Sequence, residues 1–316
     1  MPLDLTIPAT AATFDEARYL AVNADARAAV AGGRIASGRA HFERFGLREA
    51  RPMAYAHPDL PAARAAKMAR LRPFLRADMA CTWSDGRADF LTPELRAGSG
   101  IVATDAVSSL GYDGNALDLI GRFPDGLVLD CGAGYRSVYY ENVVNYEIVA
   151  YPSTDVLGIG EALPFRDGSF DAVISIAVLE HVRDPFLCAR EIARVLRPGG
   201  RLYCGVPFLQ PYHGYPHHYF NATAQGIRRL FEDDLVVEDV RVLDSTHPVW
   251  TLHWILNVWA QALPADTRKA FRKMTVADLM AMPLEQVTRP FCRQLPEDKQ
   301  LELACATVLT AHKPEV

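Results

Sequence analysis

The feature that most constrains this chain is a pair of apolar runs at residues 127–130 and 170–178. The first run, LVLD, ends at Asp130 and is followed by the turn Gly132-Ala133-Gly134. Short apolar runs of this kind are typical of parallel strands that are buried on both faces of a sheet. Glycines directly after such a strand let the backbone approach a ligand closely. Because ligands of open α/β sheets bind beyond the carboxyl ends of strands, residues 132–134 are the expected ligand site.

Five blocks of sequence, in order, resemble the class I S-adenosylmethionine-dependent methyltransferases, and most closely the group called type 11. The blocks are Asp130–Gly134, Glu161–Phe165, Ser169–Asp171, Leu179–His181 and Arg197–Gly200. The resemblance implies an α/β fold with a Rossmann-like sheet that is mostly parallel and has its last strand antiparallel. We expect the sheet to end with strands over 235–243 and 301–313. It also implies S-adenosylmethionine as the cofactor.

The glycine pair has two other interpretations. A dinucleotide site needs G-x-G-x-x-G and an acid about 20 residues further on, whereas Ser137 stands at the third glycine position here. A turn that only packs a helix on the sheet is the structural alternative. The methyltransferase pattern is itself incomplete, because Arg136 stands where its third glycine often falls.

The resemblance also implies which residues hold the cofactor. Glu147, the acid nearest the end of the second strand, is expected to accept hydrogen bonds from both ribose hydroxyls. Ile159 stands where the family often has an acid facing adenine, so adenine must rest on backbone, apolar packing or Glu161. The full expected set is Asp130, Gly132, Ala133, Gly134, Glu147, Gly160, Glu161, Ala162 and Ile176.

Composition excludes several other classes of protein. The chain has 316 residues, of which half are apolar and 22% charged, and a net charge of −5 gives no basic footprint for nucleic acid. Its six cysteines include no C-x-x-C pair, so neither disulfides nor a cysteine metal site is expected. The first residues lack a basic stretch followed by an apolar one, and the apolar stretch at 249–263 is too short to span a bilayer. We expect a cytoplasmic protein without an integral membrane segment.

Three regions are expected along the chain. Residues 14–52 form a helical module that contains Tyr19-Leu20, Asn23, Asp25, Ala29-Val30, Gly33, Ser37-Gly38, His41-Phe42, Gly46, Glu49 and Arg51. In this order these residues resemble short modules of bacterial surface-polysaccharide enzymes, and the resemblance implies docking to a partner. Within it, His41 is expected to be a packed structural residue. Residues 53–110 form a helical linker and lead-in, in which Arg64 and Lys67 are expected on a solvated face. Residues 111–316 form the methyltransferase domain, with an insertion at about 245–300.

The connection after Gly134 is short. The next strand candidate, 142–149, begins only eight residues later, whereas parallel crossovers need about a dozen residues. We therefore expect a first crossover helix of one or two turns and no helix before the third strand.

The expected acceptor site combines residues after the fourth and fifth strands. His181 and His213 are the candidate general bases for a hydroxyl acceptor, because neutral imidazole takes up protons near pH 7. His181 could equally be a structural residue or a neighbour of the cofactor, and a carboxylic acid acceptor would need no base. The histidines at 213 and 217/218 could in principle bind a metal, but no cysteine or carboxylate completes a set, so no metal is expected. The segment 207–220, here called the lid, is dense in aromatic residues, and its expected acceptor contacts are Tyr212, His217, His218 and Tyr219.

Three functions remain open from the sequence. The leading hypothesis is O-methylation of a sugar or related hydroxyl in surface polysaccharide, with a small-molecule or glycan acceptor. The uncharged stretch at 249–263 is expected to be a helix with a polar stripe of His253, Asn257 and Gln261. This helix would either pack on the sheet, line the acceptor cleft or touch a membrane surface. Its apolar character favours the second hypothesis, a small or lipid-like acceptor. The third is a catalytically silent binding protein, which Ile159 and Arg136 keep open.

Overall fold

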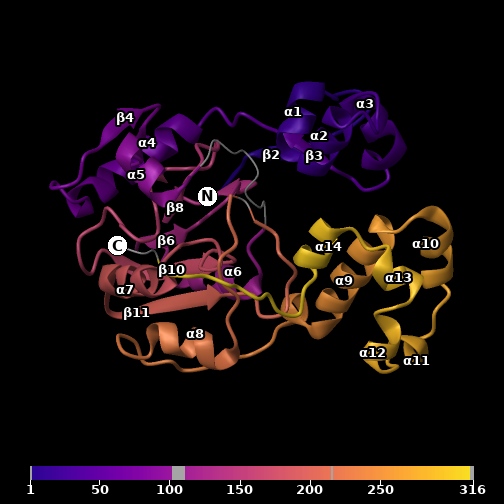
Figure 1. Cartoon of the computed structure of the whole chain (residues 1–316). Coiled ribbons are helices and arrows are strands. Elements are labelled where there is room, and N and C mark those ends of the chain that lie inside the picture. The colour runs from indigo at the N-terminus through magenta and orange to yellow at the C-terminus, as the bar shows by residue number, and fades with distance from the viewer. Residues whose placement is uncertain (1, 102–110, 215, 314–316) are drawn as a thin grey trace.

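The computed structural model describes residues 2–101, 111–214 and 216–313. Within these residues a seven-stranded sheet has the order β11-β10-β6-β8-β9-β5-β4, and its neighbouring strands are parallel except for the antiparallel pair β4–β5. This confirms a Rossmann-like, mostly parallel α/β sheet (Figure 1). The strands are β4 (Thr82–Ser84), β5 (Arg87–Asp89), β6 (Val128–Cys131), β8 (Val143–Glu147), β9 (Val156–Leu157), β10 (Phe170–Ile176) and β11 (Leu196–Gly205).

The antiparallel strand does not come from the end of the chain, which corrects the prediction. Residues 235–243 and 301–313 contain no strand, and the antiparallel edge is instead β4, before the parallel strands. The alternation at 235–243 does turn Leu235 and Val237 toward the core, and Glu238 pairs with Arg201 on β11 at 2.5 Å. Side-chain contacts thus hold this segment beside β11 without a backbone ladder. Residues 304–313 are exposed, so their apolar side chains pack on no strand.

Helices cover both faces of the sheet, because alternate strand residues point to opposite faces. On one face, the helices α4 (Leu60–Leu71), α7 (Pro185–Val195) and α8 (Ala224–Phe231) pack on Leu129, Val144 and Val173. On the other face, α6 (Gly114–Arg122) packs on strand residues that include Val128, as its spacing predicts. Within α7, the side chains of Cys188, Ala189, Ile192 and Val195 are buried, whereas Phe186 is exposed.

The connection from β6 to β8 contains no helix, so the prediction of one or two helical turns is wrong. The chain instead forms β7 (Val138–Tyr139), which pairs antiparallel with β1 (Leu3–Asp4). The backbone N–H of Leu5 donates to Ser137 at 2.7 Å, which extends this pairing. Hydrogen bonds to the amino-terminal strand thus satisfy the backbone that a helix would have satisfied. As expected, no helix lies between β8 and β9.

The amino-terminal helices form a small unit with its own core, which lies beside the sheet in Figure 1. The unit begins and ends with the antiparallel strands β2 (Thr6–Pro8) and β3 (Pro52–Ala54), which bring its two ends together. His41 is buried and its Nδ1 lies 3.1 Å from the hydroxyl of Tyr19, consistent with a packed structural residue. Its helices are α1 (Glu16–Val22), α2 (Ala24–Ala31), α3 (Gly38–His41) and the π-helix η1 (Phe42–Gly46).

The solvated face expected on α4 is wrong for two of its residues. Arg64 and Lys67 are buried against Asp155, with Lys67 Nζ 2.8 Å from Oδ2 and Arg64 Nε 3.4 Å from Oδ1. Tyr139 of β7 donates its hydroxyl to the same carboxylate at 2.6 Å. Burial lowers the pKa of Lys67 to about 8, although Asp155 raises it. This ionic cluster ties α4 to the sheet just before β9.

The region after residue 243 is helical, as the expected insertion requires. Its longest helix, α9 (Pro248–Ala262), packs through Trp259 on Phe271 and Phe291 and contributes to neither core cluster of the sheet. The expectation of a helix packed on the sheet is therefore wrong. No helix in the described part of the chain is long and apolar enough to cross a membrane. The remaining helices are η2 (Arg72–Phe74), α5 (Pro93–Ser99), η3 (Asp244–Thr246), α10 (Ala265–Phe271), α11 (Val276–Leu279), α12 (Pro283–Gln286), α13 (Pro290–Arg293) and α14 (Glu297–Glu302).

Candidate active site

The glycine turn lies where the carboxyl ends of β6 and β8 meet. Gly132 and Gly134 have φ of 79° and 61°, a left-handed conformation that favours glycine. A β-carbon on Gly132 would also lie 2.4 Å from Cγ2 of Val178, so no larger residue fits there. The N–H groups of Gly132 and Ala133 donate to the carbonyl of Tyr146 on β8. These contacts fix the turn against the neighbouring strand.

Glu147 ends β8 and faces this turn. Its Oε2 accepts the N–H of Gly134 at 2.7 Å, and its Oε1 accepts the N–H of Ile148 at 2.7 Å. Burial raises the pKa of Glu147, and these two hydrogen bonds offset part of the rise. Each oxygen keeps a second acceptor position. The structure thus brings Glu147 and the glycine turn together, as predicted.

Asp130 lies in β6, just before the glycine turn, and its carboxylate is paired with a buried arginine. It is fully buried and its carboxylate accepts hydrogen bonds from Arg136 and from the hydroxyl of Tyr112. The guanidinium carbon of Arg136 lies 4.3 Å from the centroid of the Tyr112 ring. Arg136, which departs from the family pattern, therefore compensates the buried charge of Asp130.

The segment after β9 approaches the same region. Ile159 and Ala162 belong to an apolar cluster with Ile148, directly after Glu147. A β-carbon on Gly160 would lie 2.2 Å from Sγ of Cys188, so this position needs glycine for contact with α7. Glu161 Oε1 accepts the backbone N–H of Arg183 at 3.0 Å. This bond directs Glu161 toward the segment that follows β10.

The turn after β10 carries a buried acid. Ile176 ends β10, and Ala177 has a φ of 55°, which is uncommon for a residue other than glycine. Glu180 follows and is fully buried, and neither of its carboxylate oxygens has a hydrogen-bond partner. A buried carboxylate without a partner is costly and marks a site that needs explanation. The left-handed turn at Ala177 directs the chain toward this position.

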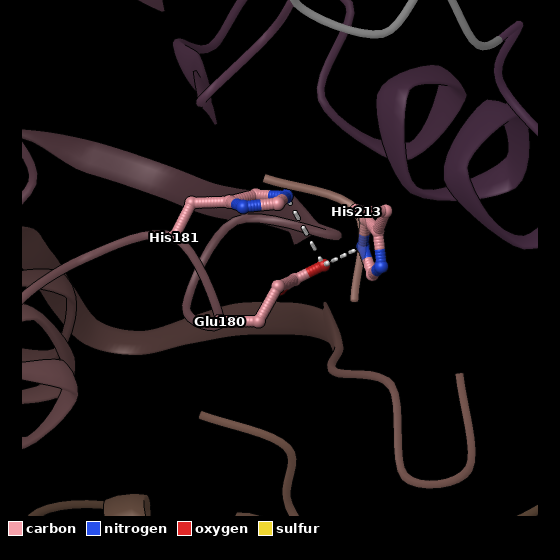
Figure 2. A group of neighbouring side chains, drawn as sticks. All are labelled: Glu180, His181 and His213. Carbon is pink, nitrogen blue, oxygen red and sulfur yellow. Dashed lines mark ion pairs between the residues drawn. The ribbon is translucent and has the colours of Figure 1, made fainter. Parts of the chain in front are cut away.

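His181 and His213, both predicted as catalytic, converge on Glu180 (Figure 2). Nε2 of His181 lies 3.6 Å and Nε2 of His213 lies 3.8 Å from Oε1 of Glu180. Burial lowers the pKa of His213, but the Glu180 carboxylate and the Pro211 carbonyl raise it, and the net shift is upward. The sequence argument against a metal is wrong on one point, because Glu180 supplies the missing carboxylate.

The lid covers this cluster with the residues predicted to contact the acceptor. Tyr212 stacks on His218 with ring centroids 5.7 Å apart, and the His217 carbonyl lies 2.5 Å from Nδ1 of His181. The hydroxyl of Tyr219 accepts from Nε of Arg183 at 3.3 Å. Of the lid's aromatic residues, Tyr215 lies outside the described residues.

A pocket of about 330 Å³ adjoins the lid along α9. The ring centroid of Trp254, which lines it, lies 5.3 Å from that of His213. His253 and Asn257 of the predicted polar stripe also line the pocket, which favours the cleft-lining interpretation of this helix. Its other lining residues are Gln210, Ser245, Trp250 and Val258.

Three residues of the site were missed from the sequence. Tyr112 contacts Asp130 from the segment before α6, where no motif marks it. Glu180 precedes His181 in a quoted block but received no role. Tyr135 lies in the glycine turn and donates its hydroxyl to the Leu5 carbonyl at 3.2 Å. Of these three, only Glu180 could have been found from the sequence, because it is an acid directly before the candidate base His181.

Comparison with known proteins agrees with this geometry. Residues 129–204 match a family model described as a methyltransferase domain. A 27-O-demethylrifamycin SV methyltransferase of Amycolatopsis mediterranei is 49% identical over 49 residues, which cover 16% of this chain and 18% of that protein. A Mycobacterium tuberculosis protein, named as a probable S-adenosylmethionine-dependent methyltransferase, is 36% identical over 97 residues, or 26% of this chain and 35% of that protein. The chain thus spans about a third or less of the length of these curated relatives.

Among solved structures, coclaurine N-methyltransferase bound to N-methylheliamine and SAH is 13% identical, covering 79% of this chain and 84% of that chain. The TM-score is 0.33, which indicates only weak structural similarity. The matched sequence, by contrast, spans β6, β8, β9, β10, α7 and most of β11, including the glycine turn, Glu147 and Glu180. Residues 129–204 are therefore similar in sequence to a methyltransferase domain.

Proposed function

We propose that the chain is an S-adenosylmethionine-dependent methyltransferase that methylates an oxygen of a sugar or related hydroxyl compound. The carrying observation is the agreement of the domain match with a left-handed glycine turn that faces a buried carboxylate on the adjacent strand. The Mycobacterium tuberculosis relative carries the same cofactor in its name. The domain match and the geometry of the turn both support binding of the cofactor at the carboxyl ends of β6 and β8.

The residues at this site fit the cofactor. Gly132 and Gly134 hold the turn in a left-handed conformation in which the backbone can approach a ligand, and Glu147 has acceptor positions left for ribose hydroxyls. Ile159 and Ala162 offer an apolar surface for a purine in place of an acidic contact. The proposed cofactor contacts also include Asp130, Ala133, Gly160, Glu161 and Ile176. In the structure, the carboxylate of Asp130 binds Arg136, and that of Glu161 accepts the backbone N–H of Arg183.

The reaction needs a group that removes the acceptor's proton. The bound cofactor supplies a methyl group on a sulfonium sulfur, so a carbon–sulfur bond breaks as a carbon–oxygen bond forms to the acceptor. His181 and His213 lie beside Glu180, whose carboxylate can stabilise a proton taken up by either imidazole. The lid holds both rings in place through the His217 and Pro211 carbonyls.

The surface around these histidines supports the proposed acceptor class. Tyr212, His217, His218 and Tyr219 offer hydrogen-bonding groups and flat rings, which suit hydroxyl-rich ligands and sugar faces. The unit at 14–52, which resembles modules of surface-polysaccharide enzymes, is proposed to dock a partner of that synthesis. A cytoplasmic location stays part of the prediction.

A small or lipid-like acceptor is the second candidate. The pocket along α9 favours it, because Trp250 and Trp254 contribute large apolar surfaces beside His213. Elongated apolar molecules would fill such a pocket better than a sugar does. The two candidates therefore differ in whether α9 contacts the acceptor.

The test is a methyl-transfer screen of the purified chain against nucleotide sugars, glycan extracts and apolar hydroxyl metabolites. His213→Ala should keep the cofactor affinity and lower turnover, because the lid follows β11 and carries no cofactor motif. His312→Ala, a change at an exposed histidine, serves as the matched control and should keep both. Absence of cofactor binding by calorimetry would overturn the proposed function. Trp254→Ala should reduce turnover only if the acceptor is apolar.

A further inference from the structure

We propose that Glu180, His181 and His213 form a binding site for a divalent transition-metal ion of the zinc type. Each residue offers one ligand atom, and these atoms lie within 4.8 Å of one another. The set combines residues from the turn after β10 with one from the lid (Figure 2). The role of the ion rests on the proposed function, but its binding does not.

The buried carboxylate is the first observation that points to an ion. Glu180 has no exposed surface, and neither oxygen has a hydrogen-bond partner. An ionised carboxylate in this position needs a compensating charge or several donors, because desolvation costs several kcal/mol. The two imidazole nitrogens approach it at 3.6 and 3.8 Å, too far for hydrogen bonds. An ion between the three groups would supply what Glu180 lacks.

The tautomers of the two histidines are the second observation. Nδ1 of His181 lies 2.5 Å from the His217 carbonyl, and Nδ1 of His213 lies 2.7 Å from the Pro211 carbonyl. A carbonyl only accepts, so Nδ1 carries the hydrogen in both rings and each neutral ring has its lone pair on Nε2. Both Nε2 atoms face Glu180. Backbone carbonyls orient metal-binding histidines in the same way.

The two separations from Glu180 are close to those expected for coordination, and all three ligand atoms lie within 4.8 Å of one another. Two ligand atoms at about 2.0–2.1 Å from Zn²⁺ in a tetrahedron lie about 3.4 Å apart. The observed separations from Oε1 exceed this by a few tenths of an ångström, which small rotations of the imidazole rings can close. Two imidazoles and one carboxylate suit Zn²⁺ and its first-row neighbours better than Mg²⁺ or Ca²⁺.

Three protein ligands leave a coordination position open, as in catalytic zinc sites. An acceptor hydroxyl at that position would lose its proton more readily, because the cation stabilises the alkoxide. One carboxylate and two neutral imidazoles leave the loaded site with a net charge of +1. In the loaded protein the ion would replace imidazole as the activating group, and the hydroxyl proton would pass to solvent water, since a nitrogen bound to metal accepts no proton. The ion would also tie the lid to the turn after β10.

The neighbouring His218 provides a matched control. Its Nδ1 accepts the N–H of His213 at 3.1 Å, and its Nε2 lies 2.8 Å from Oδ1 of Asn221, so both ring nitrogens are engaged. His218→Asn keeps an acceptor near the position of Nδ1. It should therefore preserve the backbone around His213 while removing one histidine.

The experiment measures zinc binding to the metal-stripped full chain by competition with a chromophoric chelator, and Co²⁺ binding by visible absorption. We expect one ion per chain in the wild type and at least a hundredfold weaker binding in Glu180→Gln and His213→Gln. His218→Asn should bind within about threefold of the wild type. Circular dichroism of each variant establishes that the fold is retained.

Two outcomes overturn the metal site: no zinc binding by the wild type, or equal affinity in Glu180→Gln and His213→Gln. Cofactor binding, measured in the same samples, separates the two proposals. Zinc binding without cofactor binding supports the metal site and contradicts the methyltransferase function. Cofactor binding without zinc binding does the reverse.

Discussion

The guanidinium of Arg136 forms a two-point ion pair with Asp130, from Nε to Oδ2 at 2.8 Å and from Nη2 to Oδ1 at 3.1 Å. Both side chains are buried, and the hydroxyl of Tyr112 donates to the same carboxylate at 2.5 Å. The residue that breaks the family's glycine pattern is thus the partner of the acid that ends β6. The residues at positions 130 and 136 therefore depend on each other, because each neutralises the buried charge of the other.

Breaking this pair should destabilise the fold. Arg136→Met leaves a buried carboxylate to which, among the described residues, Tyr112 still donates. Removal of one partner of a buried ion pair costs about 3–5 kcal/mol. The double variant Asp130→Asn with Arg136→Met should lose less than Arg136→Met alone. Urea unfolding measures both, with exposed Arg122→Met as the control. Equal losses in the single and double variants would contradict the pairing.

The glycine turn should not tolerate a branched side chain. Gly134 has a φ of 61°, and its N–H is held by Glu147, so the backbone cannot easily turn to accommodate valine. Gly134→Val should abolish S-adenosylmethionine binding in calorimetry while leaving a folded protein. Gly121→Val on the exposed side of α6 has free space around it and should bind normally. Unchanged binding by Gly134→Val would move the cofactor away from this turn.

Loss of the Glu147 carboxylate should weaken the binding of the cofactor. Unpaired ribose hydroxyls cost about 1–3 kcal/mol, so Glu147→Ala should reduce affinity by about ten- to a hundredfold. Since Glu147 also holds the N–H of Gly134, part of this loss would come from the turn. Titration calorimetry near neutral pH measures the loss. An effect below twofold would mean that the ribose is held elsewhere.

The same residue predicts a pH dependence of binding. Burial raises the pKa of Glu147 above the usual 4.5, and donor hydroxyls bind the ionised form. Cofactor affinity should therefore rise with pH through the window that begins at about 4.5 and level off above the raised pKa. A carboxyl group with a raised pKa also makes the free protein less stable as pH rises through that window. Glu147→Gln should bind with little pH dependence, so a persistent slope would assign it to another group.

The amino-terminal unit should be removable if its flanking strands are kept. Strands β2 and β3 pair, and the N–H of Ala9 donates to the Arg51 carbonyl at 3.1 Å. Residues 10–50 can therefore be replaced by an Asn-Gly hairpin turn. This variant should bind the cofactor within about twofold of the wild type. Deletion of 1–52 should bind much more weakly, because it also removes β1, the partner of β7.

Equal cofactor affinity in these two truncated proteins would show that β1 does not support the turn. Loss of binding in both, with folding retained, would mean that residues 10–50 contribute to the cofactor site. Circular dichroism and thermal unfolding separate these results from general misfolding.

The sheet could be predicted because its central strands are local, mostly apolar runs. β6, β8 and β10 lie where LVLD, NVVNYE and FDAVISI predict them, and Gly132 and Gly134 have the backbone that their position implied. The strands predicted at 235–243 and 301–313 failed, because alternation shows only that a face can be buried. It does not show that a neighbouring backbone is available for pairing.

The site could be predicted only in part. His181 and His213 were identified as separate histidines, but their convergence on Glu180 depends on the path of the lid. The burial of Lys67 and Arg64 was missed because their partner Asp155 lies far along the chain. Charged residues at helical spacing resemble a solvated face unless a distant carboxylate is known. Such long-range pairs leave no periodic pattern in the sequence.

The contact of the amino-terminal strand with the glycine turn also affects the order in which the chain folds. Tyr135 donates to the carbonyl of Leu5, which was synthesised 130 residues earlier. Closing so long a loop carries an entropic cost that local contacts do not have, and it requires that residues 137–139 have left the ribosome. The glycine turn is therefore expected to become rigid late in folding. Nascent chains that end before residue 139 would expose β1 as an unpaired strand, available to chaperones or to other chains.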